Sequence, residues 1–219
     1  MKNIPALDPK VLDLVTEISK EPKVEAAMAF IKDQTEVAMQ EQIELCEIEA
    51  PTFHEEKRAA SVAERMRQYG LTDVHIDEIG NVIGIRKGSG NGPVLAIGAH
   101  MDSVFPAGTD VKVKKEGNIY RAPGIGDNCS GLRALLQVLR ALEKEDIRTV
   151  GDIWFVGTVG EEGNGDIRGS KHLCANNKLD GFVAIDSTDV GRVLYGAVGS
   201  HRWRLAVDGT GGHSFADFG

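Results

Sequence analysis

The sequence predicts an α/β protein, a three-layer α/β/α sandwich around a mostly parallel sheet. The continuous apolar run at 94–99 is typical of a buried central strand, the run at 153–159 predicts another buried strand, and 182–185 is also strand-like. Segments with helical periodicity lie between these runs. Hydrophobic residues make up 42% of the 219 residues, which is enough to bury a sizeable core. Buried strands that alternate with helices favour a parallel sheet covered on both faces.

The N-terminal part is predicted to be helical. Asp8 is an N-cap, and Pro9 occupies the first position of a helix that runs to about Lys20. Pro22 begins a longer amphipathic helix that is expected to continue to about Glu47.

A third helix is predicted after Pro51. Thr52 and Glu55 have the spacing of a capping box at its start. Gly70 is the residue at which this helix should end, because glycine readily adopts the left-handed conformation that follows a helix.

Short strands and two further helices follow. The runs at 74–76 and 82–85 flank a turn that contains Gly80-Asn81, so they are expected to form a hairpin. Helical periodicity appears at 132–142 and 169–176. With the apolar runs, these elements give the alternation of an α/β domain.

The pattern changes after Arg192 and predicts a second domain. A short apolar stretch at 193–195 precedes an alternating segment at 201–207 and then the letters GTGGHS. We place the boundary near Gly196. Residues 1–195 then form the first domain, and 196–219 begin an α+β domain.

Composition and charge exclude several classes of function. The net charge is −8 and basic residues are not clustered, which disfavours nucleic acid and anionic membranes as partners. No apolar run approaches the roughly 20 residues that span a bilayer, and the N-terminus lacks a signal-peptide core. The three cysteines form no CxxC pair, so a reduced compartment is expected and we predict a cytoplasmic protein.

Polar side chains follow the predicted strands where each strand ends. In open α/β sheets, ligands bind beyond the carboxyl ends of the strands, so these side chains should converge although they are far apart in sequence. One further carboxylate lies in a glycine-rich loop before a helix. The residues are His100, Asp102, Asp127, Glu161, Glu162 and Asp186.

These residue types suit a metal-dependent hydrolase. Imidazole and carboxylate donors without thiolates favour zinc, and they also suit cobalt or manganese. Asp102, two residues after His100, can fix the tautomer of that ligand. In the Glu161-Glu162 pair, one carboxylate can bind metal while the other accepts a proton from water.

Each feature taken alone has an ordinary structural explanation. The histidine and aspartate pair could be a surface pair, adjacent glutamates are usually solvated, and loop aspartates often cap helices or form turns. Their joint placement along one sheet edge favours function. The remaining histidines, His54, His75, His172 and His201, are taken as structural or exposed.

Several motifs together resemble a known family. HMDSVFP, GIGDN, TVGEEGNGDIRGS, AIDS and GTGGHSFADFG occur in the order and spacing of the aminoacylase, peptidase T and carboxypeptidase G family of two-zinc hydrolases. The resemblance covers roughly residues 40 to 219.

The resemblance implies a set of metal ligands. His100 and Asp186 would bind one metal, Asp127 would bridge both, and Glu162 would bind the second. The Asp127-Asn128 peptide bond resembles one that is cis in the family.

The resemblance also implies catalytic roles. Glu161 resembles the general base, and Asp102 the residue that orients His100. His213 resembles a histidine of the lid domain that reaches a partner subunit's active site and stabilises the substrate carbonyl or oxyanion.

The function implied is cleavage of a peptide or N-acyl amide bond in a small peptide-like substrate by water activated between two zinc ions. Residues 196–219 would begin a lid that forms homodimers. The family's last metal-ligand histidine follows the lid, and the sequence ends at Gly219 before such a residue, so we expect the 219 residues alone to be inactive. The alternative is a non-catalytic fragment that binds one metal or none and serves as a binding or structural module.

Overall fold

The computed structural model describes residues 8–186, 191, 193–196, 198–213 and 215–216. It divides into two compact units, one up to Thr188 and one from Asp189 onward. The first unit contains all the helices and strands of the described residues. None of these helices has the length and apolar character needed to cross a membrane.

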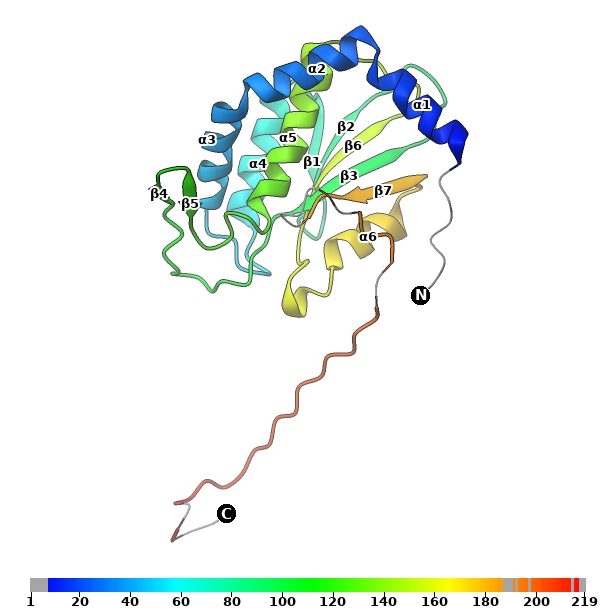
Figure 1. The fold of residues 1–219 in the computed structure, drawn as a ribbon. Helices are drawn as coiled ribbons and strands as arrows, with labels where there is room; N and C mark the ends of the chain where they lie inside the picture. Colours follow the sequence, from blue (N-terminus) through cyan, green and yellow to red (C-terminus); the bar gives the residue numbers. More distant parts are fainter. Residues whose placement is uncertain (1–7, 187–190, 192, 197, 214, 217–219) are drawn as a thin grey trace. The chain divides into compact units, whose positions relative to one another are not determined.

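A five-stranded sheet forms the centre of the first unit, in the order β1-β2-β6-β3-β7 (Figure 1). Strands β6, β3 and β7 are mutually parallel, whereas β2 is antiparallel to both β1 and β6. The sheet is therefore mixed, and the expectation of a mostly parallel sheet is only partly correct. The predicted hairpin places β2 inside the sheet, antiparallel to both of its neighbours. The strands are β1 Asp73–Ile76, β2 Val82–Arg86, β3 Leu95–His100, β6 Ile153–Thr158 and β7 Gly181–Ala184.

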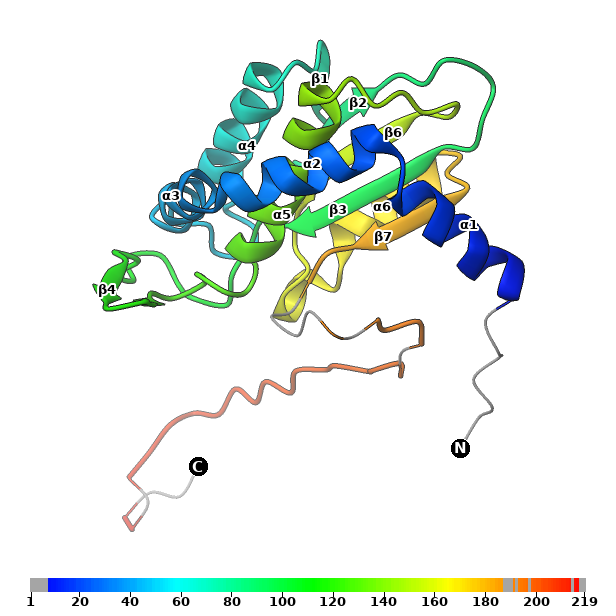
Figure 2. The ribbon, with the colours of Figure 1, turned by 45° about the horizontal axis from the view of Figure 1, so that its top comes forward.

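Helices cover both faces of this sheet, as Figures 1 and 2 show. On one face, α4 Glu56–Gln68 and α5 Cys129–Lys144 contribute leucine, valine and methionine side chains to the main core. On the other face, Leu173 of α6 Arg168–Asn176 packs on a smaller cluster with Ile83 and Val156. The predicted three-layer arrangement is confirmed in the first unit, with α6 as the helix described on the second face.

The N-terminal helices follow the sequence prediction except at one point. Helix α1 spans Pro9–Ser19, and the Asp8 side chain caps it by accepting from Lys10 N at 3.0 Å. The single long helix predicted from Pro22 is instead α2 Pro22–Asp33 and α3 Thr35–Cys46. Gln34 separates them, and Arg140 of α5 donates to its side chain at 2.9 Å. A tertiary contact therefore holds the break.

The predicted capping box before α4 is wrong. Glu55 occupies the N-cap position, and no side-chain capping bond forms there. The Thr52 hydroxyl instead donates to Asp102 Oδ2 at 2.8 Å, and Glu55 accepts from Gly160 N at 2.9 Å. Both side chains are thus engaged by loops at the carboxyl edge of the sheet. Gly70, with φ +102°, follows the C-cap residue Tyr69 at the end of α4, as predicted.

One hairpin was not predicted. Strands β4 Lys114–Glu116 and β5 Ile119–Arg121 pair in an antiparallel manner outside the main sheet. Gly117, with φ +61°, and Asn118 form its turn, and a Gly-Asn turn is a signature that could have revealed the hairpin. A short 3-10 helix at Gly163–Gly165 precedes α6.

In the second unit, the described residues form neither helix nor strand. The alternating segment at 201–207 is therefore not a strand here, and Trp203, Leu205 and Val207 are each at least 80% exposed. Apolar alternation gives a stable strand only where a partner strand and a core are available. A lid domain is not evident in the part of this unit that the structure describes, and the boundary near Gly196 stays a prediction.

Candidate metal centre

His100 ends β3 and is 3% exposed. Its Nδ1 lies 3.3 Å from Asp102 Oδ1 and 3.0 Å from the carbonyl oxygen of Asp102. Two acceptors at Nδ1 indicate that this nitrogen carries a hydrogen, which is the arrangement that a metal ion bound at Nε2 requires. Asp102, as predicted from its spacing, lies on the same side as the histidine.

Asp102 is fully buried and accepts hydrogen bonds at both carboxylate oxygens. Glu161 N donates to Oδ1 at 2.9 Å, and Glu162 N donates to Oδ2 at 3.0 Å. Burial alone would raise the pKa of Asp102, but the bonds from His100, these two amides and Thr52 outweigh it and lower this pKa to about 2. Asp102 is therefore a fixed negative charge beneath the site.

Two further carboxylates face Nε2 of His100. Asp127 Oδ1 lies 2.9 Å from this nitrogen, and Asp186 Oδ2 lies 3.9 Å from it. Burial opposes protonation of the imidazole, but the hydrogen bond and charge of Asp102, followed by the charges of Asp186 and Glu161, raise the pKa of His100 to about 9. The surroundings of this histidine strongly favour positive charge.

Glu161 and Glu162 complete the cluster from the end of β6. Because β3 and β6 are parallel with His100 opposite Thr158, the loop after β6 leaves the sheet beside His100. Burial raises the pKa of Glu161, and the neighbouring Asp186 adds to this effect. Burial and the neighbouring Asp127 likewise raise the pKa of Glu162.

The donors fit divalent cations. One ligand atom each from His100, Asp127 and Asp186 lies within 4.8 Å of the others, and the same holds for His100, Glu161 and Glu162. Carboxylates gathered at one place repel one another unless a cation neutralises them. An imidazole and carboxylates without thiolate are the donor set that zinc, cobalt and manganese accept.

Asp127 is free of the capping role that was the alternative for it. Asn128 is the N-cap of α5, and its Oδ1 accepts from Gly131 N at 3.0 Å. The Asn128 amide also donates to the carbonyl oxygen of Ile185 at 2.8 Å, which ties this loop to the end of β7. The Asp127-Asn128 bond is cis, as the resemblance implies. The Asp127 carboxylate is left to contact His100, with Oδ1 2.9 Å from Nε2.

The structure thus brings together six of the seven residues predicted for the site. His213 lies in the second unit, where its Nδ1 accepts from Phe215 N at 3.2 Å, and its role stays a prediction. The roles assigned to the six also stay predictions.

Sequence reasoning missed several residues that support the centre. Arg58, 1% exposed, donates from Nη1 to the carbonyl oxygen of Met101 at 2.7 Å. Asn81 and Glu55 hold the loop after β6, and Asn128 caps α5. The one sequence feature that could have indicated the role of Arg58 was a charged residue on an otherwise apolar helix face. The contacts of Asn81 and Glu55 join residues far apart in the chain, and sequence spacing does not predict such contacts.

The fold and the donor set define the class. A mixed α/β sheet, covered by helices and carrying a histidine and carboxylates at the carboxyl ends of parallel strands, has the arrangement of a metal-binding α/β domain. Residues 96–200 match the model of peptidase family M20/M25/M40, and this part of the chain is similar to that family.

Solved structures agree with this assignment. A tripeptidase from Staphylococcus aureus is 31% identical with a TM-score of 0.57 over 68% of this chain. The aminopeptidase PepT from Bacillus cereus is 25% identical with a TM-score of 0.60 over 69% of this chain. The alignment covers 43% of each of these two proteins.

Two curated proteins also match this chain in sequence. A Pyrococcus abyssi protein named as a LysW-lysine/LysW-ornithine hydrolase is 35% identical over 120 residues, which are 55% of this chain and 32% of the relative. The Bacillus subtilis protein YqjE is 28% identical over 190 residues, which are 80% of this chain and 50% of the relative. The chain therefore matches half or less of the length of these relatives.

Proposed function

We propose that this chain is the catalytic part of a metal-dependent hydrolase that cleaves a peptide or N-acyl amide bond in a small peptide-like substrate. The observation that carries the proposal is the convergence of His100 with two pairs of carboxylates at one sheet edge. The similarity to a tripeptidase, an aminopeptidase and a protein named as a LysW-lysine hydrolase supports this reaction class.

Four side chains would hold two zinc ions, with cobalt or manganese as substitutes. The resemblance assigns His100 and Asp186 to one ion, Glu162 to the other and Asp127 to both, and this proposal is supported by the short distances of Asp127 and Asp186 from Nε2 of His100. When bound, the ions would lower the pKa of a water molecule from about 15.7 towards 7 and polarise the carbonyl of the scissile bond. With ions bound, Asp102 would orient His100 for coordination through Nε2, since it accepts the hydrogen of Nδ1.

Glu161 would move the proton. Its carboxylate accepts one proton from the attacking water and returns it to the nitrogen of the leaving amine, so that the amide C–N bond breaks with no net change in protons. Burial raises the pKa of Glu161, which makes its carboxylate a stronger proton acceptor. His213, supplied by a partner subunit, would donate to the oxyanion.

Replacement of the base tests the proposal. In the full-length protein, Glu161→Gln should lower kcat for a dipeptide or N-acyl amino acid by about 10²- to 10⁴-fold, with the metal content unchanged. Glu116→Gln, on the exposed hairpin, is the matched control and should retain activity. Normal turnover by Glu161→Gln would contradict the assignment.

Metal analysis of the 219-residue chain addresses the non-catalytic alternative. Two tightly bound equivalents with hydrolysis of a dipeptide would exclude it. One equivalent or none, together with absence of hydrolysis by the full-length protein, would favour a binding or structural module.

A further inference from the structure

Four consecutive backbone N–H groups after β6 each donate to a buried side chain. Such a loop commonly leaves its amides to water, because it runs over the surface. Here every amide from 159 to 162 has a side-chain acceptor. Val159 N donates to Asn81 Oδ1 at 3.1 Å, Gly160 N to Glu55 Oε1 at 2.9 Å, Glu161 N to Asp102 Oδ1 at 2.9 Å, and Glu162 N to Asp102 Oδ2 at 3.0 Å.

The three acceptors come from separate parts of the chain and are almost inaccessible. Asn81 and Asp102 are 0% exposed and Glu55 is 3% exposed. A buried carboxylate is costly unless it is paired and hydrogen-bonded. Arg168 supplies the pair for Glu55, since its Nη2 lies 3.0 Å from both carboxylate oxygens. Arg168 also donates to the carbonyl oxygen of Ile79 at 2.8 Å, which ties Glu55 to the β1–β2 turn.

Asn81 is itself held in place on both sides. Its amide donates to Asp77 Oδ2 at 2.8 Å and to the carbonyl oxygen of Gly169 at 3.1 Å. Asp77 Oδ1 in turn accepts from the backbone N–H groups of residues 79, 80 and 81. The β1–β2 turn is therefore a rigid support for the Asn81 side chain.

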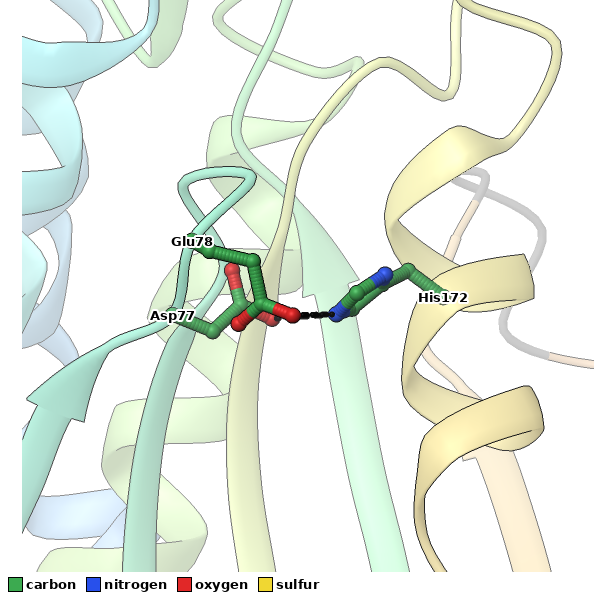
Figure 3. Close-up of side chains that lie close together, drawn as sticks. All are labelled: Asp77, Glu78 and His172. Carbon is green, nitrogen blue, oxygen red and sulfur yellow. Dashed lines mark ion pairs between the residues drawn. The ribbon is translucent and has the colours of Figure 1, made fainter.

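A second contact joins this turn to α6. Figure 3 shows the carboxylates of Asp77 and Glu78 facing the imidazole of His172. His172 Nε2 lies 2.9 Å from Glu78 Oε1 and 4.0 Å from Asp77 Oδ2. Helix α6 begins six residues after Glu162, so this contact fixes the far end of the same loop.

Asp77, Glu78 and His172 are residue types found in metal sites, but their hydrogen bonds indicate a structural contact between the β1–β2 turn and α6. Both oxygens of Asp77 already accept hydrogen bonds from its own turn. The Asn176 amide nitrogen, which donates to the carbonyl oxygen of His172, lies 3.2 Å from His172 Nδ1. Because Glu78 Oε1 lies 2.9 Å from Nε2, a hydrogen on Nε2 points to Glu78, and this nitrogen then offers no lone pair to a cation.

Two glycines show how closely the loop is packed. Gly160 has φ +60°, and a Cβ there would lie 2.5 Å from Arg168 Nε. A Cβ on Gly169 would lie 2.6 Å from Val159 N and would also overlap Asn81 Oδ1. Larger residues at these positions would displace the acceptors from the amides.

We propose that Glu55 and Asn81 are positioning residues that, with Asp102, fix the backbone of residues 159–162 and thereby the directions of the Glu161 and Glu162 side chains. Adjacent carboxylates with different tasks must point to different places, and this requires a fixed backbone between them. The effect on turnover rests on the proposed function, whereas the effect on the loop does not.

Hydrogen exchange measured by NMR on the 219-residue chain tests the effect on the loop. In Glu55→Ala and Asn81→Ala, the amides of 160–162 should exchange at least about tenfold faster than in the wild type. Glu55→Gln keeps an oxygen acceptor and should restore most of the protection. Asp180→Ala is the matched control, because Asp180 Oδ2 accepts from Val94 N at 2.8 Å at the opposite end of the sheet. In this control variant, the amides of 160–162 should exchange at the wild-type rate.

The positioning role is overturned by unchanged exchange in folded Glu55→Ala or Asn81→Ala, or by equal acceleration in Asp180→Ala. If Glu55→Ala does not fold, Asn81→Ala and Glu55→Gln decide the question in the same way.

Turnover by the full-length protein separates the two proposals. Because a misplacement of about 1 Å can cost about 10²-fold in rate, Glu55→Ala should lower kcat at least about tenfold with KM within about twofold, and Glu55→Gln should recover most of it. Absence of hydrolysis by the wild type would refute the proposed function and leave the exchange result valid. Normal kcat in Glu55→Ala with accelerated exchange would refute the link between the loop and catalysis.

Discussion

At the scale of single residues, one contact of Asp102 follows from local sequence and another from the tertiary structure. The spacing of two residues placed the aspartate on the same side as the histidine, and the sequence alone predicted this. The second engagement of Asp102, with the amides of Glu161 and Glu162, depends on the pairing of β3 with β6. Spacing gives no information about such a contact between residues some 60 positions apart.

Asp102→Asn provides a prediction at this scale. An amide in place of the carboxylate removes the negative charge opposite Nδ1 of His100. It also directs an NH₂ group at one of the N–H groups that donate to the Asp102 carboxylate in the wild type. Loss of such an orienting partner typically lowers metal affinity about 10- to 100-fold. Competition with a chelator, for zinc or cobalt, measures the affinity. An affinity equal to that of the wild type would show that Asp102 does not orient the ligand.

At the scale of elements, the helix positions were largely predictable because periodicity, proline and glycine act locally. The failures arise where a tertiary contact takes a residue that the local pattern assigns elsewhere. Thr52 and Glu55 have capping-box spacing, yet they bind Asp102 and Gly160 N. Gln34 carries no helix-breaking signature, and its contact with Arg140 lies at the break between α2 and α3. Local propensity differences are small enough for such contacts to override them.

Helix α5 offers a test of capping beside the candidate centre. Asn128→Ala removes the bond to Gly131 N and the bond to the carbonyl oxygen of Ile185, and it leaves both partners without their acceptor or donor. Loss of the cap and of a buried bond should lower the free energy of unfolding by about 1–3 kcal/mol. Urea denaturation measures this change. Asn118→Ala, in the exposed β4–β5 turn, is the control and should change stability by less than about 0.5 kcal/mol.

At the scale of the whole molecule, the layers and the order of buried runs were predictable, whereas the pairing was not. The apolar runs of β3 and β6 indicate buried strands and that of β7 a further strand, but nothing in them specifies that β2 inserts antiparallel beside β6 or that β7 lies at the edge of the sheet. The antiparallel direction of β2 does not affect the position of the site, because the site residues lie at the carboxyl ends of the parallel strands β3, β6 and β7. Convergence could therefore be predicted even though the topology was only partly correct.

The amino ends of the same strands give a prediction about pH. Asp152 accepts from Gly88 N at 2.9 Å and pairs with Lys87 at 2.9 Å, and these two contacts lower the pKa of Asp152. A carboxyl whose pKa is lowered by folding stabilises the native state above its unfolded pKa of about 3.9, and this contribution is lost as the pH falls through the lower folded pKa. Urea denaturation of wild type and Asp152→Asn should differ at pH 7 and converge near pH 2. A difference that persists at pH 2 would show that the charge is not the cause.

Metal binding should stabilise the first unit as a whole, because the proposed ligands follow three strands and a loop. A ligand that binds only the native state adds about 2.7 kcal/mol at 100 times its Kd, which for a protein of 150–250 residues raises Tm by roughly 5–10 °C. Calorimetry of the 219-residue chain with and without zinc measures this shift, and a chelator should reverse it. The double variant His100→Ala, Asp127→Asn should lose the shift, whereas Asp77→Asn should keep it, because both oxygens of Asp77 already accept hydrogen bonds from its own turn. A zinc shift that survives in the double variant and disappears in Asp77→Asn would move the metal centre from the carboxyl edge of β3 to the β1–β2 turn.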